Sequence, residues 1–545
     1  MSLPTTLEAD ARAVAAALDH YAAAAVAAAT TLTAAGEHLD DHQVVVERVA
    51  SAATDARVAR SLVAALDANP SAGDDFRGPA HAAIADLARA ARERLDPVAA
   101  ELELPEPAFP ADARAALARL GHQDVVRAIG RQVAASAGKN PWPLDETLAE
   151  VRASVRQFAD REVAPHAEHI HRDDTLVPER FITAMAELGY FGLAVPEAYG
   201  GHELGNLAMI LTTEELSRAS LASAGSLITR PEILAKALLA GGTEAQKQAW
   251  LPRLASGERM VAISVTEPNV GSDVAAVACR ATPATVDGVA GYAITGAKAW
   301  CTFAGRADVI ALLARTDPDP AKGAKGLSLF IVEKPRFDGH EFATSQPAGG
   351  RLTGKADRTP GYRGMHSFTL AFDDWFVPAA NLVGEAAGLG RGFYLQMAGF
   401  AAGRLQTGGR ACGLAQAALE HTAAYVAARA QFGQPIIDYP LTQHQLGRMA
   451  CRLAAARAIT YEAALAMDGD ERAAAPLAAQ AKLFACDAAV EITQLGQVLH
   501  GGWGYAEEYP ISRYVVDALV LPIFEGVRPI LALKVVGRAL LSGRA

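Results

Sequence analysis

The sequence predicts a mainly α-helical protein with a β-rich domain in the middle of the chain. Alanine-rich segments with helical spacing occupy the first and last parts of the 545 residues, and alanine is the strongest helix former. Between them, short β-rich runs are separated by Gly, Pro and Asp, which is typical of a compact β-domain. Strands and helices do not alternate regularly, so a doubly wound α/β fold is disfavoured.

Changes in this pattern divide the chain into four predicted parts. Breaks at Asn69–Gly73 and Leu104–Pro107 separate the first helices, among which no polar cluster has catalytic spacing. The linker Gly138–Pro143 then leads into a second helical region. The predicted parts are an accessory helical extension at 1–140, a helical domain at 141–258, a β-domain (barrel or sandwich) at 259–375 and a helical bundle at 376–545.

Local periodicity predicts the individual elements of the two later parts. The β-runs are Met260–Thr266, Gly291–Thr295, Val309–Ala314, Gly326–Val332 and Phe368–Phe372. The amphipathic helices are Phe393–Gln431, Thr442–Met467, Glu471–His500 and Ile530–Leu541. We therefore expect helices, then the β-domain, then helices, with the extension in front.

The composition argues against several classes of function. The net charge is −11, so no basic surface is expected to neutralise the phosphates of a nucleic acid. Five scattered cysteines without a C-x-x-C pair indicate neither a disulfide framework nor a zinc site, which fits a reducing cytoplasm. No signal-peptide pattern is visible at the start, and the uncharged run Tyr21–Gly36 is too short and too weakly apolar to span a bilayer. We expect a cytoplasmic protein that binds neither nucleic acid nor membrane.

Three histidines, His166, His169 and His171, lie close together in the second helical region. Their i, i+3, i+5 spacing does not put all three on one helix face, and no fourth ligand is evident in the sequence. We therefore predict solvated histidines at a helix end and no bound metal.

A single carboxylate near the C-terminus has the setting of a general base. Glu525 follows the apolar run Ala518–Phe524 and precedes Gly526, which lets the backbone turn closely behind it. An apolar setting disfavours the charged carboxylate and favours removal of a proton from a weakly acidic C–H group. A helix-end glutamate beside a capping glycine would have the same local sequence, so the catalytic interpretation depends on motifs elsewhere in the chain.

Those motifs occur in a fixed order along the second, third and fourth parts. They are Leu188–Tyr190 with Val195–Gly201, then Val265–Asp273, Gly296–Thr302, Arg429–Gly433, Gly501–Tyr505 and Phe524–Gly526. With this order and secondary structure, the region from about 145 to 545 resembles the acyl-CoA dehydrogenases, FAD enzymes that oxidise acyl-CoA thioesters to α,β-enoyl-CoA. The resemblance implies their fold, which is a helical domain, a β-barrel and a C-terminal helix bundle, here with an N-terminal helical extension.

The resemblance also assigns the contacts to FAD. Thr266 and Thr302 would offer hydroxyls to the edge of the flavin ring, where negative charge grows on reduction. Trp300 would pack against the ring, and Gly271 with Ser272 would approach a phosphate, although an ordinary β-turn could have the same residues. The full predicted set is Val265, Thr266, Gly271, Ser272, Trp300, Thr302, Arg429, Gln431, Phe432, Gly501 and Gly502.

Two of these residues imply an oligomer. In the family, the equivalents of Arg429 and Phe432 reach the FAD of a neighbouring subunit, because arginine suits a pyrophosphate and phenylalanine suits a ring. Taken alone, they could equally be a helix-end charge and a core residue. We therefore expect a homo-oligomer, either a dimer or a tetramer.

The chemistry implied by the resemblance centres on Glu525. This residue would remove the α-proton of the thioester while the β-hydrogen leaves as hydride to the flavin. Arg404 corresponds to an arginine near the CoA portion, and Gly526 belongs to the substrate-binding segment. Some relatives place the base just before the Arg404 position, where this chain has Gly403. The expected electron acceptor is an electron-transfer flavoprotein.

Several features narrow the choice of acyl group in the substrate. The extension, the enlarged segment Lys334–Met365 and the sequences Gly225–Arg230 and Ile511–Arg513 resemble a branch of the family that uses a short, branched acyl-CoA with a free carboxylate. Arg230 is the candidate anchor for that carboxylate, and a surface arginine beside Pro231 is the alternative.

Three other functions stay open at this point. One is a dehydrogenase for a short or branched monocarboxylic acyl-CoA. Another is a flavin oxidase or monooxygenase on the same fold, although such relatives commonly lack the glutamate base that this chain has. The last is a non-catalytic interaction protein in which Glu525 is inert.

Overall fold

The computed structural model describes residues 6–347 and 349–543. The chain forms two compact units. The helical unit consists of Met1–Ala153 together with Thr407–Ala545, and the mixed unit consists of Ser154–Gln406.

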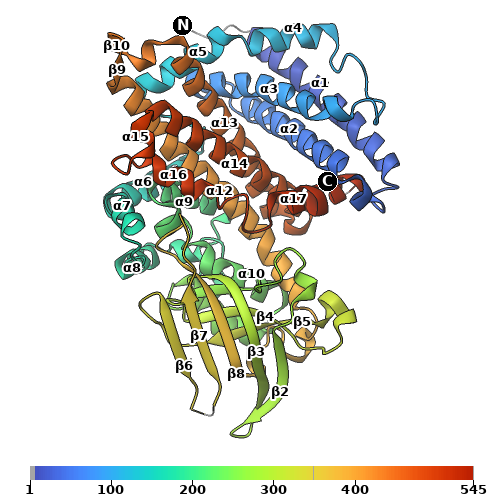
Figure 1. Cartoon of the computed structure of the whole chain (residues 1–545), viewed down its shortest axis with the longest axis vertical. Helices are drawn as coiled ribbons and strands as arrows, with labels where there is room; N and C mark the ends of the chain where they lie inside the picture. Colours follow the sequence, from blue (N-terminus) through green and yellow to red (C-terminus); the bar gives the residue numbers. More distant parts are fainter. Residues whose placement is uncertain (1–5, 348, 544–545) are drawn as a thin grey trace. The chain divides into compact units, whose positions relative to one another are not determined.

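The N-terminal residues of the helical unit form five long or medium helices. They are α1 (Thr6–Leu32), α2 (Gln43–Ala68), α3 (Asp74–Leu95), α4 (Ala111–Leu120) and α5 (Gln123–Ala135). Helix α1 packs on α2, α3 and α4 (Figure 1). Its buried side chains recur at intervals of three and four residues, as expected for a helix with one face in a core.

Helix α1 contains most of the uncharged run Tyr21–Gly36. Within the described chain, Leu7–Leu32 is long and apolar enough, by length and composition alone, to cross a membrane, a test that the core helix of a soluble protein also passes. Within an apolar stretch of 18 residues of this helix, 39% is buried in the structure. The buried face against the neighbouring helices explains its apolar character.

The C-terminal residues supply the other helices of this unit. They are the later part of α12 (Gly392–Ala428), α13 (Pro440–Gly469), α14 (Glu471–His500), α15 (Gly502–Tyr505), α16 (Ile511–Ala518), α17 (Arg528–Ile530), the helical segment Leu531–Gly537 and α18 (Arg538–Leu541). Helix α12 ends at Ala428, three residues before the predicted end at Gln431, because the chain turns there into the short hairpin of β9 (Ala430–Gln431) and β10 (Gln434–Pro435).

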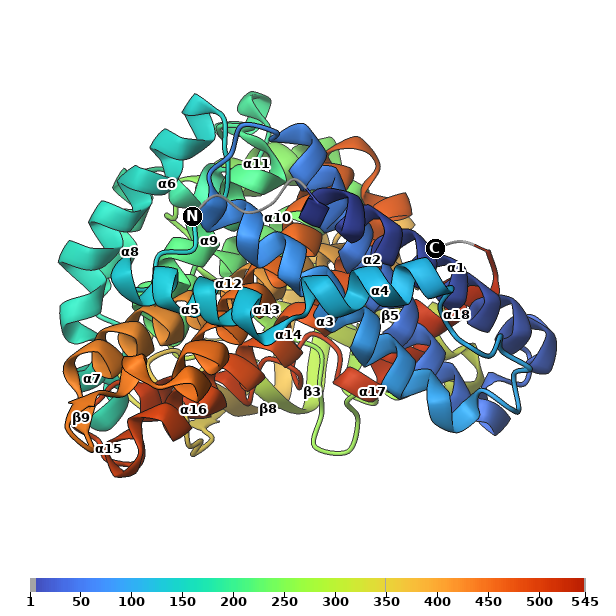
Figure 2. The same cartoon turned by 90° about the horizontal axis from the view of Figure 1, so that it is seen from above.

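Glycines allow α5 to pack very closely on α13 (Figure 2). A Cβ atom on Gly130 would lie 1.8 Å from the Gln443 carbonyl oxygen, and one on Gly447 would lie 2.0 Å from the Val126 carbonyl oxygen. No larger residue fits at either position without moving backbone. The N-terminal helices are thus packed directly on the C-terminal bundle.

The mixed unit begins with helices. They are the end of α6 (Glu146–Phe158), α7 (Ala164–Arg172), α8 (Glu179–Glu187), α9 (Gly205–Ala219), α10 (Thr229–Gly241) and α11 (Glu244–Ala255). Helices α10 and α11 pack their leucines against the apolar side chains of the sheet that follows. The histidines of α7 are not all solvated as predicted, since His171 is buried.

The sheet that the described residues of the mixed unit form has eight strands. They are β1 (Val261–Ser264), β2 (Arg280–Val286), β3 (Val289–Thr302), β4 (Val309–Arg315), β5 (Leu327–Glu333), β6 (Glu341–Ser345), β7 (Arg351–Ala356) and β8 (Ser367–Pro378). Their order is β1-β4-β2-β3-β8-β7-β6, with β5 paired to β4 (Figure 1). Strands β4 and β5 are apolar and buried almost throughout, whereas β6, β7 and β8 alternate buried and exposed residues.

This arrangement confirms the predicted fold class, mainly α-helical with a central β-domain. The five predicted β-runs correspond to β1, part of β3, β4, β5 and part of β8. Strands β2, β6 and β7 were not predicted, because Pro283 in β2 and Gly354 in β7 interrupt the usual strand signal. The predicted domain boundaries remain predictions.

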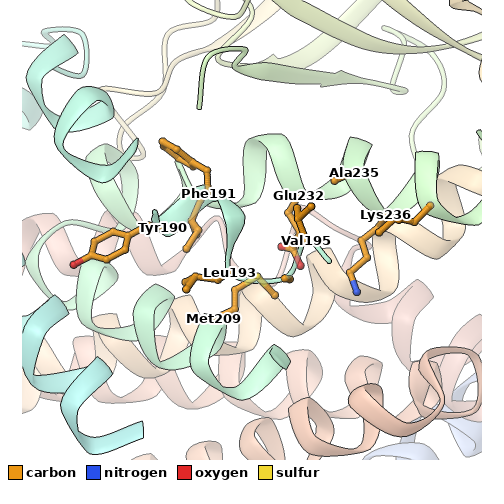
Figure 3. A pocket seen from close by; sticks show the side chains of 11 residues that line it. Tyr190, Phe191, Leu193, Val195, Met209, Glu232, Ala235 and Lys236 are labelled. Atoms are coloured by element: carbon orange, nitrogen blue, oxygen red, sulfur yellow. The ribbon is translucent and has the colours of Figure 1, made fainter. Parts of the chain in front are cut away.

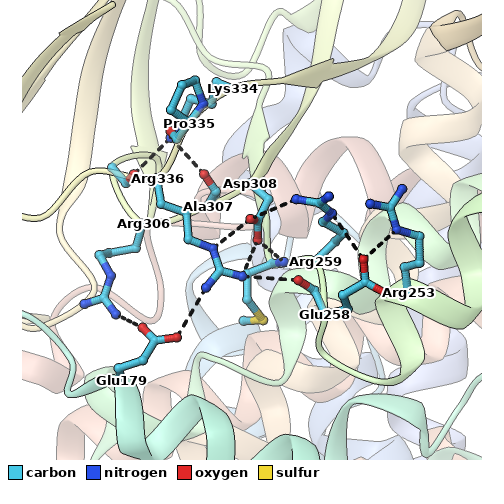
Figure 4. Close-up of polar contacts among 12 residues, drawn as sticks. Glu179, Arg253, Glu258, Arg259, Arg306, Ala307, Asp308, Lys334, Pro335 and Arg336 are labelled. Atoms are coloured by element: carbon cyan, nitrogen blue, oxygen red, sulfur yellow. Dashed lines mark hydrogen bonds and ion pairs between the residues drawn. The ribbon is translucent and has the colours of Figure 1, made fainter.

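A polar network anchors the start of the enlarged segment Lys334–Met365 (Figure 4). Arg336 donates to both carboxylate oxygens of Asp308, at 2.7 and 2.9 Å, and also pairs with Glu179 at the start of α8. Arg306 pairs with the same glutamate. The Lys334 ammonium donates to the carbonyls of Gly305, Ala307 and Pro335. Such convergent charge-assisted bonds hold the segment against α8.

We predict that His81 makes stability depend on pH. His81 is buried in α3, neither ring nitrogen has a partner among the described residues, and burial lowers its pKa to about 4. The unfolded chain therefore takes up a proton first as pH falls, and stability should drop by about 2 kcal/mol between about pH 7.5 and about pH 5.

The comparison is between the wild type and His81→Leu in chemical denaturation at both pH values. In the His81→Leu variant, the drop in unfolding free energy between the two pH values should be smaller than in the wild type by about 2 kcal/mol. An identical pH dependence in the two proteins would contradict the assignment.

Candidate active site

A buried ion pair holds the loop that contains Val265, Thr266, Gly271 and Ser272. Lys298 on β3 is 0% exposed, and its ammonium donates to a carboxylate oxygen of Glu267 at 3.0 Å and to the Val265 carbonyl at 2.9 Å. Glu267 in turn accepts from the backbone N–H groups of Ala278 and Cys279, at 2.9 and 2.8 Å. Burial lowers the pKa of Lys298, and the facing carboxylate opposes this effect.

A β-bulge in β3 presents Trp300 to the outside of the sheet. The pairing of β3 with β8 shifts between Lys298 and Cys301, so Ala299 and Trp300 on β3 face the single residue Thr369 on β8. In a regular strand, Lys298 and Cys301 would point to opposite faces because they are three residues apart, whereas with the extra residue between them both are buried. Trp300 takes the extra position with φ of +58° and stays 58% exposed.

The bulge also brings Trp300 beside Thr266. The backbone N–H of Ala299 donates to the Thr266 carbonyl at 2.9 Å, which joins the end of β1 to the bulge. The hydroxyl of Thr302, two residues after Trp300, shares a hydrogen bond of 2.9 Å with the hydroxyl of Ser367. Three of the predicted flavin contacts, from two motifs, therefore lie on one connected part of the sheet.

The rest of the loop is open. Gly271 and Ser272 are exposed, and a Cβ atom on Gly271 would meet no atom within 4 Å. An exposed indole, hydroxyl groups at or just after strand ends and an open glycine-containing loop are suited to an aromatic ring with a phosphate-bearing tail. The described residues thus fit the FAD that the sequence predicts.

In the helical unit, the predicted contacts to a second FAD are at the surface. Phe432 is 94% exposed with φ of +53°, at the tip of the β9–β10 hairpin beside the exposed Arg429 and Gln431. Gly501 and Gly502, also exposed, follow the end of α14.

Tyr425 connects these two surface segments. Its ring stacks on His500 with centroids 4.2 Å apart, and its hydroxyl donates to the His500 carbonyl. Because Tyr425 lies in the last turn of α12, just before the hairpin, and His500 ends α14, the two helix ends are joined at this point.

Glu525 is half-buried in a strained turn of the helical unit. Its φ is +53°, and its Oε2 atom is buried without a hydrogen-bond partner among the described residues. The Gly526 carbonyl accepts from the Lys482 ammonium at 2.7 Å, which fixes the turn from behind. The preceding apolar run is only partly buried, since Ile523 is exposed.

Two arginines flank this turn, and sequence reasoning missed both. The Arg410 guanidinium lies 4.8 Å from the centroid of the Phe524 ring. Arg528 pairs with Asp487 on α14 at 2.9 Å and with Glu47 on α2 at 2.8 Å. The motif Phe524–Gly526 had pointed to the turn but not to the contacts that hold it, since Arg410 and the partners of Arg528 come from distant helices.

The two candidate substrate arginines lie in the mixed unit. Arg230 is near the start of α10 and only 5% exposed, so the alternative of a surface arginine is wrong. Its Nε–H donates to the Ser226 carbonyl at 3.2 Å, and no carboxylate pairs with it among the described residues. Arg404 lies half-buried on α12.

Arg230 also acts on the strand that carries Trp300. Burial raises the pKa of the Cys301 thiol to about 12, and the charge of Arg230 is among the effects that oppose this rise.

A small cavity near α10 is too small for an acyl group. It has about 10 Å³ of space and is lined mainly by apolar side chains of α9, α10 and the residues before α9, with Glu232 and Lys236 on its wall (Figure 3). Such a volume holds about one water molecule. The carboxylate of Glu232 accepts a hydrogen bond of 2.8 Å from the Gln406 side chain on α12.

Comparison with known proteins gives a consistent picture. Family models for the N-terminal, middle and C-terminal domains of acyl-CoA dehydrogenases match residues 145–258, 262–375 and 390–541. The chain is 42% identical over 400 residues to a (2S)-methylsuccinyl-CoA dehydrogenase of Cereibacter sphaeroides, covering 73% of this chain and 70% of that protein.

The similar solved structures also include acyl-CoA dehydrogenases. A glutaryl-coenzyme A dehydrogenase in complex with glutaryl-CoA is similar with a TM-score of 0.65 and 30% identity, over 72% of this chain and 94% of that one. A glutaryl-CoA dehydrogenase from Mycobacterium smegmatis in complex with FADH2 has a TM-score of 0.62 and 25% identity, over 73% of this chain and 95% of that one.

We predict that removing the Lys298 ammonium destabilises the mixed unit. Lys298→Met leaves the carboxylate of Glu267 buried without its cation, which should cost about 3–5 kcal/mol of unfolding free energy. The measurement is chemical denaturation, followed by protein fluorescence. Lys355→Met is the matched control, because Lys355 is an exposed partner of Glu341, and it should behave like the wild type. Equal stability of both variants would contradict the role of the pair.

Proposed function

The chain belongs to the acyl-CoA dehydrogenase family, FAD-dependent oxidoreductases acting on acyl-CoA, and from this premise we propose that its substrate is (2S)-methylsuccinyl-CoA. The product would be mesaconyl-CoA, in the ethylmalonyl-CoA pathway. The 42% identity to a (2S)-methylsuccinyl-CoA dehydrogenase supports this choice. That acyl group is short, branched and carries a free carboxylate.

The burial of Arg230 is the observation that carries the proposal. A guanidinium that is 5% exposed and has no carboxylate partner among the described residues is costly unless an anion arrives to pair with it. A planar guanidinium matches a carboxylate in a two-bond geometry. We assign the distal carboxylate of the substrate as this anion.

Glu525 is the proposed base. Its Oε2 atom is a buried acceptor without a protein donor among the described residues, so it is available for a proton from the substrate. The turn at Glu525 is held by Lys482 through the Gly526 carbonyl, which fixes the backbone next to this carboxylate. A positioned carboxylate of this kind serves as general base for the α-proton.

The residues proposed to hold FAD are those of the loop and the bulge, Thr266, Gly271, Ser272, Trp300 and Thr302. When bound, FAD supplies the acceptor for the two electrons removed from the substrate. The chain itself contributes the exposed indole face, the hydroxyls and the backbone of the open loop.

The proposal extends to partners. A phenylalanine that is 94% exposed on a hairpin next to Arg429 supports contact with a second subunit, and hence a homo-oligomer, dimer or tetramer. Arg404 would contact the CoA portion. An electron-transfer flavoprotein is the proposed electron acceptor, and the cytoplasm the proposed location.

We predict that Arg230→Met impairs only the dicarboxylic substrate. With methylsuccinyl-CoA, kcat/KM should fall by about 100-fold, or about 2.7 kcal/mol, because one buried charge pair is lost. With 2-methylbutyryl-CoA, which has a methyl group in place of the carboxylate, the change should be small. The exposed Arg391→Met is the matched control variant. An equal loss on both thioesters would overturn the assignment, and faster wild-type turnover of 2-methylbutyryl-CoA would favour a monocarboxylic substrate.

We predict that Glu525→Gln stops proton removal without loss of cofactor. The rate of flavin bleaching under anaerobic acyl-CoA should fall by about 10²–10⁴-fold, while the flavin absorbance of the purified protein is retained. Glu508→Gln, an exposed glutamate in the same region, should bleach at the wild-type rate. Unchanged bleaching in Glu525→Gln would exclude this residue as the base.

A further inference from the structure

Three potential metal ligands meet in the mixed unit, from segments far apart in the sequence. Asp174 follows α7, His340 precedes β6 and His366 precedes β8. Their ligand atoms all lie within 4.8 Å of one another. His366 is buried, Asp174 is half-buried and His340 is exposed, so the cluster is open to solvent on one side.

Both ring nitrogens of His366 face hydrogen-bond acceptors. Nδ1 lies 3.2 Å from the Gly364 carbonyl oxygen, and Nε2 lies 3.1 Å from Oδ1 of Asp174. A neutral imidazole carries only one N–H. If Nδ1–H donates to the carbonyl, the lone pair of Nε2 points at a carboxylate oxygen, and a cation between the two atoms would satisfy both.

The arrangement around His366 is the one that metal-binding histidines commonly show. Such a histidine donates its other ring N–H to a carbonyl or carboxylate, which fixes the tautomer and the ring orientation. Gly364 provides this carbonyl. The His340 ring lies beside it, with centroids 4.4 Å apart.

We propose that Asp174, His340 and His366 bind a divalent transition-metal cation of the Zn²⁺ type, with water in a remaining position. Two ligands of a tetrahedral zinc ion lie roughly 3.3 Å apart, close to the 3.1 Å between Nε2 of His366 and Oδ1 of Asp174. Two imidazoles and a carboxylate form a ligand set that suits zinc.

The nearby Arg363 leaves the Asp174 carboxylate available as a metal ligand. Arg363 lies 3.6 Å from Oδ1 of Asp174, and its hydrogen bonds go to the carbonyls of Thr359 and His171, both at 3.1 Å. It therefore reduces the negative charge of the site without making a short bond to the carboxylate.

The site would hold the enlarged segment Lys334–Met365 at both ends. His340 lies near the start of this segment and His366 directly after it, while Asp174 belongs to the loop between α7 and α8. The cation would complement the ion pairs of Arg336 with Asp308 and Glu179 at the start of the segment. Its role is structural, and it is independent of the proposed acyl-CoA chemistry.

The test uses the full-length, FAD-loaded protein after treatment with a chelator. Zn²⁺ binding is measured by titration calorimetry, and Co²⁺ replaces Zn²⁺ for absorption spectroscopy. We expect one site per chain, a visible Co²⁺ spectrum of a four- or five-coordinate ion, and a higher melting temperature with Zn²⁺.

Variants identify the ligands. His340→Ala and Asp174→Asn, which change exposed or half-buried side chains, should each weaken Zn²⁺ binding by at least about tenfold and abolish the Co²⁺ spectrum. His169→Ala is the matched control, because His169 is an exposed histidine on α7 paired with Asp173, and it should bind like the wild type. No saturable binding, or binding that survives both ligand variants, would overturn the proposal.

Discussion

The buried pair of Lys298 and Glu267 is the interaction on which the candidate site depends. It joins the loop after β1 to the middle of β3, and the backbone bonds that Glu267 accepts close the loop on itself. A lysine with no exposed surface is tolerated only because a carboxylate and a carbonyl accept hydrogen bonds from its ammonium group. The bulge follows from the same constraint, since Lys298 and Cys301 are both buried and the residues between them must absorb the register shift. Trp300 is presented outward as a result.

In the helical unit, a second set of long-range contacts fixes the turn at Glu525. Lys482 holds its backbone, and Arg528 connects it to α14 and to α2 of the N-terminal helices. The close crossing of α5 on α13 at Gly130 and Gly447 adds a contact that no side chain could replace. The extension therefore supports the segment that carries the proposed base, which gives these residues a role although they carry no catalytic motif.

The enlarged segment Lys334–Met365 shows the same reliance on polar anchors. Its start is held by Arg336 and Lys334, and its ends lie next to the cluster of Asp174, His340 and His366. Segments with few apolar residues gain order from charge pairs or metal ions more readily than from a core of their own. The sequence did not predict this cluster. The histidines close to Asp174 in the sequence are those of α7, whereas the two histidines that lie beside it in the structure, His340 and His366, belong to distant segments.

The sequence alone determined the fold class, most long helices and the family, because these depend on local periodicity and on short motifs whose order is preserved. It also pointed to Glu525, Thr266, Trp300 and Arg230 as residues. Only the tertiary structure decided that Arg230 is buried with no carboxylate partner in the described part of the chain, that a bulge exposes Trp300, and that His366 faces an aspartate 192 residues away. Strands β2 and β7 were missed because pairing with neighbours, and not local preference, makes them strands. Contacts of this kind depend on the path of the whole chain, and no local spacing encodes them.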